Sequence, residues 1–228
     1  MKTFEETLLE ELYGMITPNK VEMFERLAPL KTNHLTVVLE NIYQEHNASA
    51  VLRTCESFGV QSLHVIEKDW KYQVQRDIAR GAGRWVDMYN YNDETPTITC
   101  LNQLKSKGYR IVATTPHEND CTIDSLPIDE PIALVFGTEG DGISQEVIDM
   151  ADDFVKIPMY GFTESFNISV SAAISMYALR TRLEKSDVNW KLSDDELTQL
   201  KINWCTRIIP HGNKVVPEVI KRLKVNFY

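Results

Sequence analysis

Glycines follow a buried apolar run in a pattern that lets the backbone hold a ligand. The run Ile132 to Phe136 leads directly into a loop at 137–144, which reads Gly-Thr-Glu-Gly-Asp-Gly-Ile-Ser. Glycine permits a positive φ and lets the backbone approach a ligand closely. The loop lacks the Gly-Lys-Ser/Thr ending of a P-loop and the spacing of a dinucleotide fingerprint. On its own it therefore also fits a tight turn.

A second loop carries hydroxyl and amide side chains. The apolar run Phe154 to Pro158 predicts a short strand, and the loop after it ends at Ser165-Phe166-Asn167, where a helix rich in serine and alanine begins. Ser165 and Asn167 alone would most simply cap that helix. Because both loops follow strands, they predict a cleft at the carboxyl ends of those strands, where open α/β sheets usually bind ligands.

The elements that must position these loops alternate between strands and helices. Gly59 is expected to end the first helix as a left-handed residue, and Asn47 is expected to cap its start. Short connections between alternating elements predict an α/β fold with a mainly parallel sheet flanked by helices. Apolar periodicity predicts strands at 35–40, 61–67, 86–91, 109–114, 132–136 and 154–158, and helices at 47–58, 70–80, 95–107 and 166–184.

Arg53 lies in the helix that follows the first strand. Ala48, Val51, Cys55 and Phe58 recur in this helix at steps of three and four residues and form its buried face. Arg53 lies two residues from both Val51 and Cys55, about 200° around the helix, so its guanidinium points away from the core. An ordinary surface arginine would occupy the same position.

Helical extensions flank the α/β part. Residues 3–28 predict two helices separated at Thr17-Pro18-Asn19, because proline interrupts a helix. Residues 194–204 and 215–224 predict two further helices. We therefore expect an N-terminal helical extension at 1–31, an α/β domain at 32–185 and a basic helical extension at 186–228.

Composition and charge limit the classes of protein to which this chain can belong. The 228 residues are 43% hydrophobic and 25% charged, as in soluble globular proteins. The net charge of −9 counts against a polyanion partner. However, residues 201–228 carry six basic side chains and one acid, and residues 68–84 carry five basic side chains and two acids. An acidic body with two basic patches can still hold a polyanion, although ordinary solvated faces give the same pattern.

Several classes are disfavoured by the sequence. It contains no run of 18 apolar residues, and its start is acidic, so we expect neither a membrane span nor a signal peptide and place the protein in the cytoplasm. The cysteines are far apart, which indicates reduced thiols rather than disulfides or a metal site. They are Cys55, Cys100, Cys121 and Cys205.

Three segments resemble the motifs of the SpoU (TrmH-type) branch of the SPOUT RNA methyltransferases. The first comprises Asn47 to Thr54 and closes with Phe58-Gly59 a few residues later. The second is the loop at 137–144, and the third consists of 157–159 followed by 165–173. They occur in the family's order within residues 35–185. Members of this family transfer a methyl group from S-adenosylmethionine to a ribose 2′-hydroxyl of RNA.

The resemblance implies a fold that periodicity alone does not. In this family the chain forms a C-terminal deep trefoil knot, which makes the cofactor pocket, and two copies form a homodimer through the knot region. The serine- and alanine-rich helix at 169–178 suits such a contact between subunits, and it suits internal packing equally well.

The resemblance also implies roles for individual residues. Because arginine stays protonated, we expect Arg53 to hold an RNA phosphate and stabilise the developing oxyanion, with Glu139 or a water taking the proton. Phe166 stands where the family usually has leucine, which predicts a reshaped adenine pocket. No metal is implied, since the leaving group is a neutral thioether. The catalytic residues implied are Arg53, Asn47, Glu139, Ser165 and Asn167, and the cofactor-binding residues are Thr114, Gly137, Ile157 and Phe166.

The resemblance is strongest to members that methylate guanosine 18 in the tRNA D-loop, because of the helical extensions, the stretch at 81–85 and the basic tail. The same chemistry on the tRNA wobble ribose or on ribosomal RNA stays open, as does an RNA-binding module without catalysis. A Rossmann-type nucleotide enzyme is disfavoured, because the Gly-x-Gly-x-x-Gly motif is missing.

Overall fold

The computed structural model describes residues 2–115, 121–138 and 140–227. The chain divides into two compact units. One unit is Thr32–Trp190, and the other combines the residues up to Lys31 with those from Lys191 onward.

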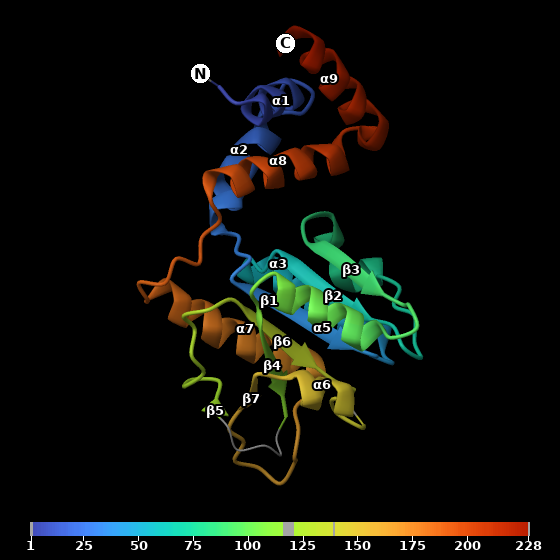
Figure 1. The fold of residues 1–228 in the computed structure, drawn as a ribbon, viewed down its shortest axis with the longest axis vertical. Coiled ribbons are helices and arrows are strands. Elements are labelled where there is room, and N and C mark those ends of the chain that lie inside the picture. Colours follow the sequence, from blue (N-terminus) through green and yellow to red (C-terminus); the bar gives the residue numbers. More distant parts are fainter. Residues whose placement is uncertain (1, 116–120, 139, 228) are drawn as a thin grey trace. The chain divides into compact units, whose positions relative to one another are not determined.

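The unit Thr32–Trp190 is built on a seven-stranded sheet of order β3-β2-β1-β6-β4-β7-β5 (Figure 1). Every pair of neighbouring strands is parallel, so the predicted α/β sheet is confirmed. The short strand β5 was not predicted. The strands are β1 (Leu35–Glu40), β2 (Ser62–Ile66), β3 (Asp87–Tyr91), β4 (Arg110–Thr114), β5 (Cys121–Thr122), β6 (Ile132–Phe136) and β7 (Asp153–Lys156).

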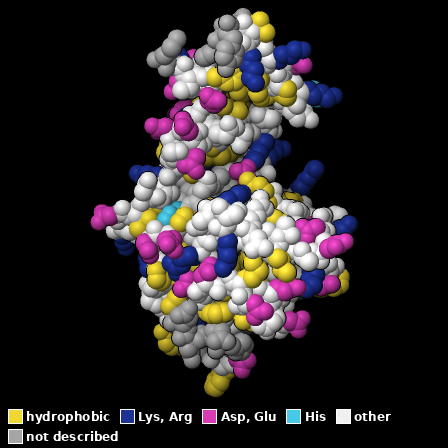
Figure 2. Space-filling model, in the orientation of Figure 1, with side chains coloured by type: hydrophobic (Ala, Val, Ile, Leu, Met, Phe, Trp, Pro, Cys, Tyr) yellow, Lys and Arg dark blue, Asp and Glu magenta, His cyan; other side chains and the backbone are white. Residues whose placement is uncertain are grey.

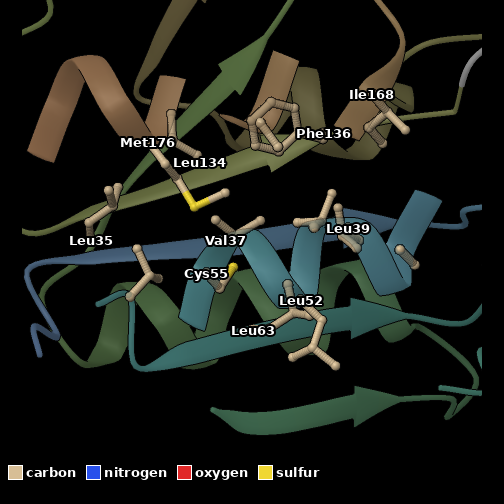
Figure 3. Packing of buried hydrophobic residues seen from close by; sticks show 14 of the residues in the cluster. Leu35, Val37, Leu39, Leu52, Cys55, Leu63, Leu134, Phe136, Ile168 and Met176 are labelled. Carbon is tan, nitrogen blue, oxygen red and sulfur yellow. The ribbon is translucent and has the colours of Figure 1, made fainter. Parts of the chain in front are cut away.

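Helices cover both faces of the sheet. Alternate residues of each central strand face opposite sides, and both sides are buried, which explains the continuous apolar runs. Val37 of β1 and Leu134 of β6 pack against Met176 of α7 (Ile168–Glu184) and Cys55 of α3 (Glu45–Phe58), as Figure 3 shows. The opposite face, which includes Val38 and Val135, packs against α5 (Pro96–Ser106) and α6 (Gln145–Met150).

The helix predicted at 70–80 is wrong over its first half. Only α4 (Arg76–Ala79) is α-helical, and the 3₁₀-helix η2 (Ala82–Arg84) follows it. The backbone N–H of Tyr72 donates to Glu67 Oε1 at 3.0 Å, and that of Gln75 donates to Ser49 Oγ at 3.0 Å. Side chains outside the segment therefore take the hydrogen bonds that a helix would have used.

The second unit is helical throughout its described elements. Thr3 with Glu6 and Ser193 with Glu196 form capping boxes that begin α1 and α8. Phe24 packs edge-to-face on Trp204, with ring centroids 5.1 Å apart, and so joins α2 to α8. The elements are α1 (Phe4–Tyr13), α2 (Pro18–Leu27), the 3₁₀-helix η1 (Ala28–Leu30), α8 (Asp194–Ile208) and α9 (Gly212–Phe227).

A polar network ties three of these helices together. Tyr13 Oη donates to Glu25 Oε1 at 2.6 Å, and Lys201 Nζ lies 3.0 Å from the same oxygen. Burial and the hydrogen bond to Glu25 raise the pKa of Tyr13. Burial opposes the charge on Glu25, but the hydrogen bonds from Tyr13 and Lys201 outweigh it and lower the pKa of Glu25. The network therefore fixes α1, α2 and α8 with an ionised carboxylate at its centre.

Candidate active site

A cavity of about 670 Å³ lies at the carboxyl ends of β4, β6 and β7. Its walls come from the strand ends and the loops that follow them, together with the first turns of α7. The cleft predicted from the two loops is therefore present. The lining residues are 114–115, 136–138, 140–143, 148, 155–157, 159, 164–168, 171 and 175.

The residues that the motifs assign to a cofactor all line this cavity. Thr114 follows β4, Gly137 follows β6, Ile157 follows β7, and Phe166 lies just before α7. Three strand ends and the start of α7 thus bring together residues from four places in the sequence. Their role in binding a cofactor stays a prediction.

The glycine loop is folded tightly on itself. Thr138 and Gly142 exchange backbone hydrogen bonds, with N–H to oxygen pairs at 2.8 and 3.1 Å. A Cβ on Gly137 would lie 2.1 Å from the backbone oxygen of Gly142, so no larger residue fits. Gly142 has a φ of 72°, in the left-handed region. Two glycines are therefore required for this turn, one for space and one for its conformation.

A buried carboxylate holds the far end of the glycine loop. Glu40, the last residue of β1, is 3% exposed. Its Oε2 accepts from the backbone N–H of Ser144 at 2.9 Å, and its Oε1 accepts from Ser144 Oγ at 2.7 Å and from Thr97 Oγ1 at 3.0 Å. Ser144 is also the N-cap of α6. Glu40 thus fixes the loop to β1 and α5. The sequence offered one sign of this role, because Glu40 is a charged residue at the end of an otherwise largely apolar strand.

Asn167 joins the third motif to the first. Its Oδ1 accepts from the backbone N–H of Ser169 at 2.9 Å and caps α7, as predicted. Its Nδ2 donates to Oδ1 of Asn47 at 3.2 Å, and Nδ2 of Asn47 donates to Gln44 Oε1 at 2.9 Å. Ser165 and Asn167 both line the cavity, and Asn47 reaches it through Asn167.

The prediction that Asn47 caps α3 is wrong. The helix begins at Glu45, with Gln44 as its N-cap residue, and Asn47 lies in the first turn. The backbone N–H of Asn47 donates to the carbonyl oxygen of Gln44 at 3.0 Å. The helix therefore starts earlier, and the Asn47 side chain is left to contact Gln44 and Asn167 instead.

Arg53 lies apart from the cavity. It is exposed on α3, as its position on the helix predicted. It lines a separate shallow hollow of about 410 Å³ between α3, α4 and α7, which also includes Ala173 of α7 and Ile78 of α4. Among the described residues, none that lines this hollow also lines the larger cavity. Within one chain the structure therefore does not bring Arg53 together with Ser165 and Asn167.

The remaining predicted catalytic residue, Glu139, lies outside the described residues. Within the described part of the chain, no group of three or more His, Cys, Asp or Glu side chains is placed to hold a metal ion. All four cysteines are free thiols. Every helix in the described ranges is too short or too polar to traverse a lipid bilayer.

Ser175 was missed at the sequence level, although it lines the cavity and is 1% exposed. It lies one helical turn beyond Ser171, which also lines the cavity. The spacing of four residues places both hydroxyls on the same side of α7. The four-residue spacing from Ser171, which belongs to the third motif, could therefore have pointed to Ser175 as a second polar residue facing the cavity.

Known proteins resemble this chain in sequence and in fold. A tRNA (guanosine(18)-2′-O)-methyltransferase of Borreliella burgdorferi is 42% identical over 198 residues, which cover 87% of this chain and 89% of that protein. A protein of the same name from Thermus thermophilus is 34% identical over 166 residues, covering 72% and 84% of the two chains.

A solved structure described as the A. aeolicus TrmH/SpoU tRNA modifying enzyme superposes with a TM-score of 0.75 and 28% identity, covering 84% of this chain and 98% of that chain. The SpoU rRNA Methylase family profile matches residues 34–177, more than half of the sequence, and this range contains all three motifs and every residue that lines the cavity. The chain belongs to the SpoU rRNA Methylase family.

Proposed function

We propose that this protein transfers a methyl group from S-adenosylmethionine to the ribose 2′-hydroxyl of guanosine 18 in tRNA. The observation that carries the proposal is the cavity at the strand ends, which gathers Thr114, Gly137, Ile157 and Phe166 beside Ser165 and Asn167. The relative named for guanosine-18 methylation spans 87% of the chain, including the helical extensions in large part, which supports tRNA as the substrate.

The cavity fits the cofactor. Its volume of about 670 Å³ lies within the range of small-molecule pockets, about 300–1,000 Å³. The glycine loop brings backbone to the cavity wall, and the buried floor is largely apolar, as an adenine ring requires. S-adenosylmethionine supplies an electrophilic methyl group carried by a positively charged sulfur.

The residues at the cavity margin orient the ribose. Ser165 and Asn167 are exposed and line the cavity, so their hydroxyl and amide are available to an incoming nucleotide. Asn47 fixes the Asn167 amide at 3.2 Å. We assign Arg53 to the RNA phosphate next to the reacting ribose, because a guanidinium stays protonated and binds phosphate through two N–H groups. Glu139 or a water accepts the proton of the 2′-hydroxyl.

The separation between Arg53 and the cavity supports a homodimer through the knot region. Val170 and Tyr177 are 44% and 61% exposed on α7, and Ala173 lies between them in the hollow that contains Arg53. Residues spaced by three, four and seven positions share one side of a helix. Paired α7 helices would cover this apolar row and place Arg53 of one subunit at its partner's cavity.

A basic surface on α9 supports contact with tRNA. Lys214, Lys221 and Lys224 are exposed and are spaced by seven and three residues, which places them on one side of the helix. Figure 2 shows Lys and Arg side chains gathered over α9. Phosphate contacts of this kind supply affinity that does not depend on sequence.

We also propose that the chain forms the family's trefoil knot in the segment that leads from β7 into α7.

The experiment is methyl transfer from labelled S-adenosylmethionine to tRNA transcribed without modifications, followed by mapping of the labelled nucleotide. We expect label on the ribose of guanosine 18 and none when that nucleotide carries a 2′-deoxyribose. Label at the wobble ribose, or only on ribosomal RNA, would select the alternative substrates. Absence of transfer to any RNA, with tRNA binding retained, would select the non-catalytic module.

Mixed dimers test the placement of Arg53. We expect an Arg53→Ala subunit and a Gly137→Ala subunit each to be inactive alone, because one lacks the guanidinium and the other lacks a usable cofactor loop. If Arg53 serves the partner's cavity, a dimer of the two variants contains one complete site and regains up to half of the wild-type activity. If Arg53 acts within its own subunit, mixing restores nothing.

A further inference from the structure

One polar atom stands out at the floor of the cavity. Ser175 Oγ is buried and has no hydrogen-bond partner among the described residues. Only a few buried side-chain polar atoms in a protein of this size lack a partner, so each calls for an explanation. Because Ser175 also lines the cavity, a molecule bound there can reach the hydroxyl.

The surroundings of Ser175 indicate which part of a ligand it meets. The cavity-lining residues buried to the same degree as Ser175 are Phe136, Val155 and Ile168, all apolar. The charged lining residues lie further out, since Asp141 and Glu164 are exposed and Lys156 is half-buried. Among the described lining residues that are buried to this degree, Ser175 therefore offers the single hydroxyl in an otherwise apolar floor.

This arrangement suits the two ends of S-adenosylmethionine differently. An ammonium or carboxylate group would lose its hydration at the floor without an opposite charge to replace it, which is costly. A purine ring buries two apolar faces and needs hydrogen bonds only at its edge. We infer that the Ser175 hydroxyl binds a ring-edge nitrogen of the cofactor's adenine and selects for that base.

The inference rests on the proposed cofactor and adds a residue that the three motifs do not contain. Ser175 either donates to a ring nitrogen or accepts from the exocyclic amino group, because a hydroxyl can do both. Its own helix supplies no competing partner among the described residues, so the hydroxyl turns freely to suit the base.

The test compares Ser175→Ala with the wild-type protein by calorimetric titration. The ligands are S-adenosylhomocysteine and 5′-methylthioadenosine, which shares the nucleoside but lacks the amino-acid end. Loss of one hydrogen bond of about 0.5–1.5 kcal/mol corresponds to a dissociation constant about two- to tenfold higher. We expect this loss for both ligands alike, together with an unchanged or higher melting temperature without ligand.

Purine analogues of S-adenosylhomocysteine locate the contact on the base. Analogues in which N1, N3 or N7 is replaced by carbon, or the amino group by oxygen, are titrated against both proteins. We expect one analogue to bind wild type more weakly while losing no further affinity in Ser175→Ala. Ser106→Ala, a serine change on α5 away from the cavity, should leave every dissociation constant unchanged.

The outcomes are distinguishable. If Ser175→Ala binds both ligands as tightly as wild type, or weakens only S-adenosylhomocysteine, the adenine assignment is overturned. If no purine analogue couples to Ser175, the hydroxyl meets the ribose and the assignment is again overturned. If the wild-type protein itself binds neither ligand, the proposed function fails before Ser175 is tested.

Discussion

Asn167 Nδ2 lies 3.2 Å from Asn47 Oδ1, a contact between two motifs that are 120 residues apart in the sequence. The same Asn167 side chain caps α7 through its Oδ1. One amide therefore stabilises a helix with its oxygen and orients a neighbour with its nitrogen. The two roles can be separated by substitution.

Asn167→Asp is expected to keep the cap and lose the donor. Aspartate caps helices as well as asparagine does, so the free energy of unfolding should stay within about 0.5 kcal/mol of wild type. Methyl transfer should fall, because two oxygens then face each other across the contact with Asn47. Asn167→Ala should lose methyl transfer too and, because it also removes the cap, about 1 kcal/mol of the free energy of unfolding. Urea denaturation and single-turnover kinetics measure the two effects, and equal stability loss in both variants would contradict this division of roles.

Gly137→Ala is expected to abolish cofactor binding. Its Cβ would lie 2.1 Å from a backbone oxygen, so the glycine loop must move out of its place in the cavity wall. Gly140→Ala is the matched control, because apart from its chain neighbours no atom of the described residues lies within 4 Å of the added carbon. Titration with S-adenosylhomocysteine should show binding to the second variant only. Similar affinities for the two variants would show that the loop does not contact the cofactor.

Glu40→Ala is expected to destabilise the protein by roughly 3 kcal/mol, because it leaves the buried Thr97 hydroxyl and the half-buried N–H and hydroxyl of Ser144 without their acceptor. Glu40→Gln should lose about 1 kcal/mol or less. Its oxygen can still accept from the Ser144 N–H, and both hydroxyls can turn to accept from its amide. Chemical denaturation measures both variants. A Glu40→Gln protein as unstable as Glu40→Ala would show that the carboxylate charge itself is required.

Arg53→Ala is expected to separate catalysis from folding and cofactor binding. Arg53 is exposed and lines no part of the cavity, so the melting temperature and the affinity for S-adenosylhomocysteine should match wild type. Methyl transfer should fall by about 10²–10³-fold, as for loss of an oxyanion-stabilising donor. Arg53→Lys keeps the charge but loses the two-pronged geometry, so its methyl-transfer rate should lie between those of wild type and Arg53→Ala. A normal rate for Arg53→Ala would remove Arg53 from the site.

His64 is expected to make stability depend on pH. Burial and the nearby charge of Lys107 lower the pKa of His64 to about 4, and Nδ1 lies 2.9 Å from Tyr91 Oη. The unfolded chain, with a pKa of about 6.5, binds the proton more readily, so stability is lost as pH falls from about 6.5 to 4. This loss is about 3 kcal/mol.

His64→Phe removes the titrating group while keeping a ring against Tyr89, which stacks on His64 at 4.9 Å between centroids. Urea denaturation at several pH values should therefore show a shallower decline for the variant between pH 6.5 and 4. Because other acidic groups titrate in the same range, the difference between the two proteins is the quantity that tests His64. Parallel curves would show that the pKa of His64 is the same in the folded and unfolded states.

The strands were predictable because their signals are local. β1 and β6 have the bounds that were predicted, since each is an apolar run closed by polar residues or glycine. The exposure of Arg53 and the left-handed Gly59 also follow from neighbours along the chain. Helical periodicity shows which way a side chain faces, but it does not show which distant segment it meets.

The features that the sequence did not predict depend on distant contacts. Residues 70–75 are not helical, because the side chains of Glu67 and Ser49 accept hydrogen bonds from the backbone of this segment. Glu40 gains its function from Ser144, 104 residues away, and Ser175 becomes unusual only where α7 passes the ends of three strands. The role of each predicted site residue stays a prediction, as do the boundaries of the domains.

The helical unit built from both ends of the chain constrains how the protein can be made. α1 emerges from the ribosome first, but α8 and α9, which pair with it through contacts such as Arg222 Nη2 to Glu11 Oε2 at 2.6 Å, follow only after residues 32–190. The leucines of α1 that become buried stay uncovered throughout that interval. A nascent chain halted before α8 would therefore present a ready target for chaperones and proteases, so truncated products should be cleared even where the sheet has already folded.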